Sequence, residues 1–392
     1  DGYGINLIPL ASLAMTVYAD DPCAAFPIKG EKRYSSYEEA LTRKMHKAIA
    51  IIQFKLEGQL AAEHPEYRME HRRLLDKIDY EKGTVCLDGR EYVLKDTGFP
   101  TIDPQNPYEL SPEEKEAMDR IVSAFRNSEK LRRHINLFLD KGGLYKVYNG
   151  NLLFHGCVPL NPDGSFREVN VYGRICSGRA LYDELEKYVR KAFFAVNKEE
   201  KKRGRDIMWF IWAGADSPLF GKDRMTTFER YFLEEPEPKK ERKNPYYQML
   251  EDPAVMRRIL EEFGLSWETG HIINGHVPVH QSEGENPVKC DGKLIVIDGG
   301  FCRAYQKVTG IAGYTLVCNS YGMQLSAHHP FVSVETAVRE ERDIVSTKVV
   351  VSQNARRHLI GDTDTGHEIV ERIEELKQLL EAYREGVIKE KK

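Results

Sequence analysis

The sequence has no apolar stretch that approaches the roughly 20 residues needed to cross a bilayer. Its first residues show no basic-then-apolar signal pattern. The seven cysteines are scattered, odd in number and without a C-x-x-C pair, which argues against a disulfide framework or a zinc knuckle. The sequence therefore predicts a soluble, cytoplasmic protein with reduced thiols and no membrane partner.

A strong charge of one sign is also missing. The 57 basic and 61 acidic residues leave a formal net charge of −4, so no overall field favours nucleic acid as a partner. Three common catalytic signatures are absent as well: Gly-x-Ser-x-Gly, Gly-x-x-x-x-Gly-Lys-Ser/Thr and Gly-x-Gly-x-x-Gly. Metal-assisted hydrolysis is then the leading class of reaction.

The first 143 residues are predicted to be mainly helical, because apolar residues recur there at helical spacing. Ser36 and Glu39 have the spacing of a capping box at the start of the longest helix. Asp88-Gly89, inside an alternating stretch, predicts a β-hairpin over residues 84–94. Helices are expected over residues 7–18, 37–60, 63–79 and 112–125, and from there to about residue 139.

The character of the chain changes after Gly143, where short β-rich runs begin. Residues 144–148 and 151–154 predict two strands joined by an Asn-Gly turn. The large apolar run 207–212 is interpreted as a buried strand. Residues 272–273, 293–297 and 315–318 predict successive strands of one sheet, and helices are expected over 180–196, 253–264 and 369–383.

Two histidines each follow one of these strands. His155 precedes Gly156, and His276 follows Gly275, so each imidazole is delivered to the rim of a sheet beside a residue that lets a ligand approach the backbone. For either histidine alone, an ordinary role at a strand end is the better interpretation. Together they predict a shared metal site, because metal centres of hydrolases collect ligands from several strand ends.

A loop after the 207–212 run carries Lys222 and Arg224. Arginine binds phosphate through its planar fork and lysine as a point charge, so the two can contact a phosphate group. An ordinary polar loop explains them equally well. Residues 361–366 begin like a calcium loop, but Ile373 stands where the closing Glu is needed, so a helix cap is the better interpretation.

Five longer motifs resemble a single enzyme family. They are Asn-Gly-Asn-Leu-Leu-Phe-His-Gly-Cys at 149–157, Trp-Phe-Ile-Trp-Ala-Gly at 209–214, residues 217–231, Ile-Asn-Gly-His-Val-Pro-Val at 273–279, and residues 297–301 with 305–316. Together they resemble class 3 fructose-1,6-bisphosphatase, from Asp1 to the C-terminal helix. The resemblance implies an α/β fold, a calcineurin-like metallophosphatase β-sandwich flanked by helices, with a dinuclear, typically manganese (Mn2+), centre.

The resemblance also implies roles for particular residues. His155-Gly156 matches the fourth metal motif of the family and Gly275-His276 the fifth, which implies that both histidines are ligands of the same ion. Lys222 and Arg224 are then candidates for contacts to the sugar phosphate. The first three motifs, Asp-x-His, Gly-Asp-x-x-Asp-Arg-Gly and Gly-Asn-His-Asp, do not occur. The catalytic residues are therefore expected upstream of Asp1, and the chain is expected to be an incomplete, inactive part.

In the complete enzyme the resemblance implies hydrolysis of fructose 1,6-bisphosphate to fructose 6-phosphate by metal-activated hydroxide, a reaction of gluconeogenesis. The expected organisation is a core helix over 1–20, an inserted mainly helical region over 21–142, the C-terminal part of the metallophosphatase domain over 143–350 and a helical tail over 351–392. A homo-oligomer is a possible assembly. The alternatives are a protein phosphatase, which shares the His-Gly motif, and a non-catalytic interaction protein built on a degenerate metallophosphatase scaffold.

Overall fold

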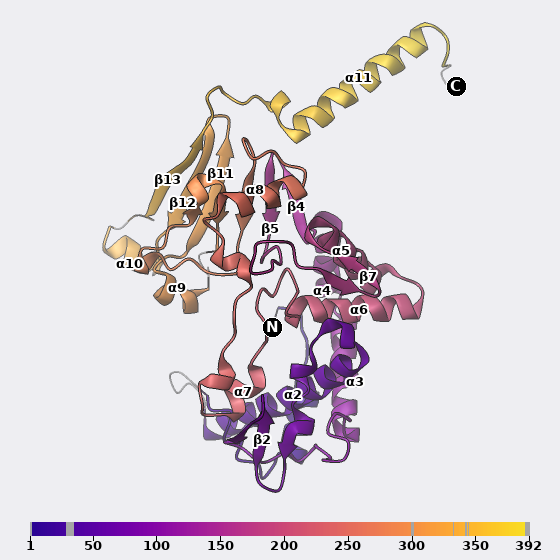
Figure 1. Ribbon diagram of the computed structural model, residues 1–392, viewed down its shortest axis with the longest axis vertical. Helices are drawn as coiled ribbons and strands as arrows, with labels where there is room; N and C mark the ends of the chain where they lie inside the picture. The colour runs from indigo at the N-terminus through magenta and orange to yellow at the C-terminus, as the bar shows by residue number, and fades with distance from the viewer. Residues whose placement is uncertain are drawn as a thin grey trace. The chain divides into compact units, whose positions relative to one another are not determined.

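The computed structural model describes residues 2–28, 35–298, 302–331, 333–341, 343 and 345–388. The fold is mixed α/β, as predicted from the sequence. The chain divides into two compact units, each built from two segments (Figure 1). Unit 1 comprises Asp1–Gly143 and Phe166–Asn244, and unit 2 comprises Leu144–Ser165 and Pro245–Lys392. The domain boundaries expected from the sequence stay a prediction.

Unit 1 is mainly helical. Leu10 and Leu13 of the first helix pack with Ile52 of the second and Ile121 of the third, which forms one of its hydrophobic clusters. The long second helix is confirmed, but its capping box uses Ser35 and Glu38, one residue earlier than predicted. The helices are α1 (Ile8–Val17), α2 (Ser36–Glu63), α3 (Pro112–Asn127), α4 (Glu129–Lys141), α5 (Gly178–Phe194), α6 (Lys198–Ala213) and α7 (Thr227–Phe232).

The predicted hairpin of unit 1 is also confirmed. Asp88 and Gly89 both have positive φ, 48° and 77°, the backbone conformation that a two-residue hairpin turn requires. The hairpin pairs β2 (Thr84–Leu87) with β3 (Arg90–Val93), and β1 (Ile78–Asp79) adds a third strand. A second small sheet pairs β6 (Val169–Val171) with β7 (Arg174–Cys176).

The predicted helix over residues 63–79 is wrong. The segment consists of three short 3-10 turns, Pro65–Tyr67, Glu70–Arg72 and Leu75–Lys77, followed by β1. Pro65 cannot continue α2, and it restricts the residue before it, so the long helix stops at Glu63. The side chains of His64 and Arg72 are buried here and bind acidic partners, which is a tertiary constraint that helical spacing does not reveal.

The predicted strand over residues 207–212 is also wrong, because this run is the second half of α6. Ile207, Phe210 and Ile211 are buried, whereas Met208 and Trp212 are exposed, which is the one-sided pattern of an amphipathic helix. The side chain of Asn197 caps this helix by accepting hydrogen bonds from the backbone N–H groups of residues 199 and 200. Periodicity alone does not separate a short apolar run in a strand from one in a helix.

Unit 2 contains a five-stranded sheet in the order β4-β5-β8-β10-β9. The three central strands run parallel, and the two outer strands are antiparallel to their neighbours. The carboxyl ends of β5 and β8 therefore meet at one edge of the sheet. The strands are β4 (Tyr145–Tyr148), β5 (Asn151–Phe154), β8 (His271–Asn274), β9 (Val288–Lys289) and β10 (Leu294–Val296), and α8 (Pro253–Glu262) precedes β8.

Residues 315–318 do not join this sheet, so the prediction of one continuous sheet is wrong at its third strand. They belong to β11 (Gly313–Asn319), which turns at Ser320 and pairs along its whole length with β12 (Gly322–His328). A third strand, β13 (Ser346–Gln353), completes this separate antiparallel sheet. The remaining helices are α9 (Arg303–Thr309), α10 (Val334–Arg339) and α11 (Asp364–Arg384). None of the helices in the described ranges is long and apolar enough to cross a membrane.

Candidate metal centre

The parallel strands β5 and β8 position the two histidines that the sequence singled out. Leu152 pairs with Ile272, and both side chains are fully buried. The two strands therefore reach the edge of the sheet that carries the histidines in a fixed register. His155 follows the end of β5 by one residue and His276 follows the end of β8 by two. The φ angle of His276 is 70°, an uncommon value for a residue other than glycine, and such backbone conformations are concentrated at functional sites.

The two imidazole rings lie next to each other in an edge-to-face arrangement. Nε2 of His155 and Nδ1 of His276 are 3.1 Å apart, and the ring centroids are 4.9 Å apart at 77°. Two nitrogen ligands of one ion, bonded at about 2.1 Å and at right angles, lie about 3.0 Å apart. The observed separation therefore fits two adjacent ligand positions around a single ion. His155 is exposed, so the site is open to a ligand.

Hydrogen bonds join the two histidine turns directly. The backbone N–H of Gly275 donates to the carbonyl of His155 at 3.0 Å. The amide of Asn274 donates to the carbonyl of Gly156 at 3.2 Å and to the Tyr246 hydroxyl at 2.9 Å. Asn274 and Tyr246 are buried. Neither residue is predicted from the sequence, where the available signal is an asparagine that ends an otherwise apolar strand.

A carboxylate lies beside the second turn. A Cβ atom placed on Gly275 would stand 3.6 Å from Cβ of Asp298 and 3.9 Å from its Oδ2. The carbonyl of Asp298 accepts a hydrogen bond of 2.9 Å from the N–H of Val279, which holds the segment in place. Oxygen ligands are those that hard divalent ions prefer, but the Asp298 carboxylate does not lie within 4.8 Å of both imidazoles, so the three side chains do not form one ligand group. No role is predicted for Asp298 from the sequence, and residues 299–301 of the same motif lie outside the described residues.

Lys222 and Arg224 lie in unit 1, and each contacts a carboxylate of that unit. Lys222 Nζ is 2.8 Å from Glu241, and Arg224 is 3.3 Å from Asp88. Although burial raises it, the hydrogen bonds from Lys222 and Thr226 lower the pKa of Glu241 to about 2. Both cationic side chains keep about a third of their surface exposed, 36% and 35%. Their predicted role in binding phosphate stays a prediction.

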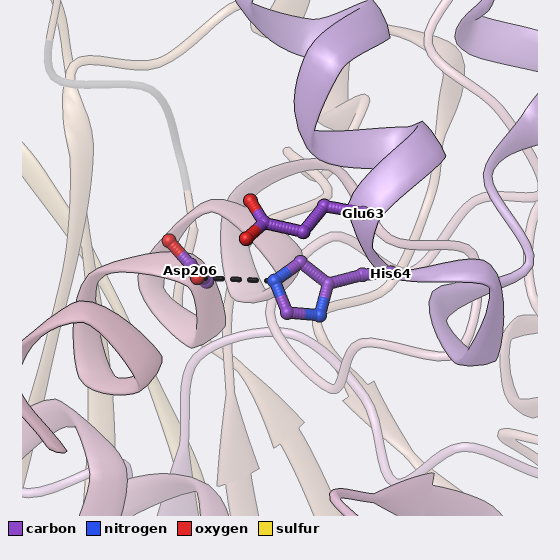
Figure 2. Close-up of side chains that lie close together, drawn as sticks. All are labelled: Glu63, His64 and Asp206. Atoms are coloured by element: carbon purple, nitrogen blue, oxygen red, sulfur yellow. Dashed lines mark hydrogen bonds and ion pairs between the residues drawn. The ribbon is translucent and has the colours of Figure 1, made fainter. Parts of the chain in front are cut away.

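A second candidate group lies in unit 1 and was not foreseen. Among the described residues, Glu63, His64 and Asp206 form the one group of at least three potential ligands close enough to hold a metal ion, with ligand atoms within 4.8 Å of one another (Figure 2). His64 Nε2 is 3.0 Å from Asp206. Since 142 residues separate these two, and the segment after Glu63 was expected to be helical, the sequence offered no signal for this group.

The carboxylates of this second group already have a cation. Lys202 Nζ lies 2.6 Å from Glu63 and 2.8 Å from Asp206. Although burial lowers it, hydrogen bonds to Asp206 and Glu63 raise the pKa of Lys202 above its ordinary value. Glu66 contacts the other nitrogen of His64 at 2.9 Å. The Lys202 ammonium therefore pairs with both carboxylates of this group, and a metal ion could bind there only by displacing it.

Two histidines at the ends of neighbouring parallel strands in a mixed α/β fold are typical of metal-dependent hydrolases. Comparison with known proteins gives the family. The chain belongs to the family described as Firmicute fructose-1,6-bisphosphatase, which matches residues 1–385. The resemblance noted on the sequence motifs is thereby confirmed. No solved structure matches the chain.

Curated relatives carry the same family name. The chain is 54% identical over 392 residues to the fructose-1,6-bisphosphatase class 3 of Clostridioides difficile (strain 630) and 53% identical to that of Clostridium novyi (strain NT). It is 52% identical over 393 residues to that of Clostridium acetobutylicum. Each alignment covers 100% of this chain but 59% of the relative, so the chain spans about three fifths of the length of these proteins.

Proposed function

We propose that this chain forms part of a fructose-1,6-bisphosphatase that hydrolyses fructose 1,6-bisphosphate to fructose 6-phosphate and phosphate. The observation that carries the proposal is the pair of imidazole nitrogens 3.1 Å apart at the ends of β5 and β8, in a chain of this family. The reaction would belong to cytoplasmic carbohydrate metabolism. The calcineurin-like sandwich is the architecture that we propose for the complete enzyme.

His155 and His276 would hold one manganese ion. A bound divalent ion lowers the pKa of water and neutralises phosphoryl oxygens, which is the chemistry that phosphate ester hydrolysis needs. Two imidazoles are too few ligands for two such ions, each of which takes about six. We therefore propose that the 392-residue chain alone hydrolyses the substrate poorly.

Lys222 and Arg224 are proposed to contact the phosphate groups of the sugar. Both are cations on partly exposed side chains, and arginine in addition can bind a phosphate through two parallel hydrogen bonds. Their contacts with Glu241 and Asp88 hold the two side chains in defined positions before a substrate binds. The predicted order of core helix (1–20), inserted region (21–142), metallophosphatase part (143–350) and tail (351–392) remains part of this proposal.

A chimera tests the function. The matched part of the Clostridioides difficile relative is replaced by this chain, which is 54% identical to it and covers 59% of its length. With Mn2+ present, the chimera should release phosphate from fructose 1,6-bisphosphate and not from phosphopeptides, and the chain alone should release little. A folded chimera that prefers phosphopeptides, or that hydrolyses neither substrate, would contradict the proposal.

A further inference from the structure

Two buried side chains lie behind the turns that carry His155 and His276. Asn274, the last residue of β8, is 3% exposed, and Tyr246, in the 3-10 turn Pro245–Gln248, is fully buried. Burying a polar side chain lowers stability unless the group is hydrogen-bonded, so the bonds that these two side chains make show what they contribute. All of these residues belong to unit 2.

The amide of Asn274 bridges the two turns. Its Nδ2 donates to the carbonyl of Gly156, the residue directly after His155, at 3.2 Å, whereas Asn274 itself stands two residues before His276. Because a carbonyl oxygen can only accept, this bond determines which end of the amide points toward Gly156. Asn274 Oδ1 is buried and accepts no hydrogen bond within the described part of the chain. The amide is therefore oriented for the bond between the turns, although this leaves one acceptor without a donor.

Tyr246 contacts the ends of both strands. Its hydroxyl accepts a hydrogen bond of 2.9 Å from the Asn274 amide. Its ring packs edge to face against that of Phe154, the last residue of β5, with the ring centroids 6.0 Å apart at 67°. Phe154 directly precedes His155 in the chain. One fully buried side chain therefore contacts a residue just ahead of each histidine.

The backbone at His276 needs such external support. The N–H of Val277 donates to the carbonyl of Gly275 at 2.9 Å, and His276, the residue between them, has a φ of 70°. A hydrogen bond over two residues with a positive φ at the centre is the rare and strained form of the γ-turn. A strained backbone persists only where the surrounding structure holds it. The contacts of Asn274 with Gly156 and Tyr246 lie immediately before this turn and meet that requirement.

We propose that Asn274 and Tyr246 are positioning residues, which hold the two imidazoles at the separation that one divalent ion requires. The observed 3.1 Å between Nε2 of His155 and Nδ1 of His276 is close to the roughly 3.0 Å expected for adjacent ligands. Asn274 and Tyr246 affect the binding of the ion by fixing the backbone that carries its ligands, without contacting it. This role rests on the proposed metal site, and the variants below can fail separately from that site.

Replacing Asn274 by leucine removes the bridge and retains a side chain of similar size. Leucine also removes the buried acceptor that has no donor, so the fold should be retained. The chimera that carries Asn274→Leu should bind Mn2+ about tenfold more weakly, measured from the electron paramagnetic resonance signal of free Mn2+. A high Mn2+ concentration should then restore kcat, because both histidine ligands are still present.

Asn151 provides a matched control in the same sheet. It is the first residue of β5 and 8% exposed, and its amide also donates two hydrogen bonds, to the carbonyls of Tyr148 and Asn149. Its Oδ1 likewise accepts no hydrogen bond from any described residue. Asn151 stands at the end of β5 away from His155, so Asn151→Leu should leave the Mn2+ affinity unchanged. An equal loss of affinity in both leucine variants would show that weakening the sheet is sufficient, and would overturn the proposal.

A second substitution tests whether Tyr246 acts through Asn274. Tyr246→Phe removes the hydroxyl and keeps the ring. It should weaken Mn2+ binding about threefold in the otherwise unchanged chimera and have no further effect beside Asn274→Leu, because the hydrogen bond is already lost there. Equal effects in the two backgrounds, or no effect in either, would overturn the role of Tyr246.

Crystal structures of the 392-residue chain test the geometry without a metal. In Asn274→Leu the imidazole nitrogens of His155 and His276 should lie further apart than 3.1 Å, whereas Asn151→Leu should retain that separation. If Asn274→Leu retains both the separation and the Mn2+ affinity while His155→Ala binds Mn2+ weakly, the positioning role is wrong and the metal site stands. If His155→Ala binds Mn2+ as tightly as the unchanged chimera, the metal site itself is wrong.

Discussion

His155 and His276 are 121 residues apart in the chain, yet Nε2 of one lies 3.1 Å from Nδ1 of the other. Neither residue reaches this position by local structure alone. The parallel pairing of β5 with β8 brings the strand ends together, and the hydrogen bond from the Gly275 N–H to the His155 carbonyl joins the two turns. The functional proposal depends on this contact, because two neighbouring imidazoles are needed to hold one ion.

Lys202 determines whether the second candidate group binds a metal. Replacing it by alanine leaves Glu63 and Asp206 without their cation, which should lower the free energy of unfolding by about 1–2 kcal/mol at this partly exposed site. Added Zn2+ should then raise the melting temperature of Lys202→Ala and leave the wild type unchanged. Lys201→Ala, at an exposed neighbour, is the control. Equal stabilisation of the wild type by zinc would show that the ammonium does not compete.

A buried ion pair links α2 to the start of α3. Lys55 Nζ and Glu114 are 2.7 Å apart, and both side chains are 0% exposed. Glu114→Gln leaves the buried ammonium without its counter-charge while retaining the side-chain length of the capping box, so we expect a loss of about 3–5 kcal/mol in unfolding free energy. Urea denaturation measures it, with the exposed Glu113→Gln as control. A loss no greater than that of the control would contradict this reading.

The stability of unit 2 should depend on pH through His271. Burial, helped by the Lys293 ammonium, lowers the pKa of His271 from 6.5 to about 4. Between these values the unfolded chain binds the proton more readily, so stability is lost as the pH falls from about 6.5 towards 4. His271→Asn cannot titrate and should lose less unfolding free energy between pH 7 and pH 5. If His367→Asn, at an exposed histidine, reduces the pH dependence of the unfolding free energy by the same amount, His271 is not the cause of that dependence.

Lys222 is predicted to contribute to substrate binding. In the chimera, Lys222→Ala should raise KM for fructose 1,6-bisphosphate about tenfold with kcat nearly unchanged, because a phosphate contact made equally in the ground and transition states affects binding alone. Lys240→Ala, on an exposed side chain of the same unit, should leave KM unchanged. An unchanged KM accompanied by lower stability would assign Lys222 a structural role as the partner of Glu241.

Local signals in the sequence predicted much of the fold. The Asp88-Gly89 and Asn149-Gly150 turns, with positive φ at all four residues, place two hairpins where they were expected. The helix expected from residue 112 begins there as α3, capped by Ser111. The two failures have different causes. The run 207–212 is the end of a helix that begins at residue 198, and a short apolar run alone does not separate strand from helix, whereas the segment after Glu63 is shaped by Pro65 and by the distant partner of His64.

For the candidate site, too, local features could be predicted from the sequence and long-range contacts could not. Each histidine could be found from the strand, glycine and turn beside it, because those features are local. The partners that support the pair could not be found in this way. Asn274 reaches Tyr246, and Asp298 lies beside Gly275, only after the sheet has formed. The network of His64 with Asp206 likewise joins segments that no short-range pattern connects.

The rate of fructose 1,6-bisphosphate hydrolysis by the chimera, with each histidine replaced in turn, tests the central claim most directly. His155→Ala and His276→Ala should each lower kcat/KM by at least about 100-fold, since loss of even an outer partner of a metal ligand costs about 10–100-fold. His367→Ala, an exposed histidine on α11, should retain full activity. If either of the first two variants also retains full activity while remaining folded, His155 and His276 do not jointly hold a catalytic ion.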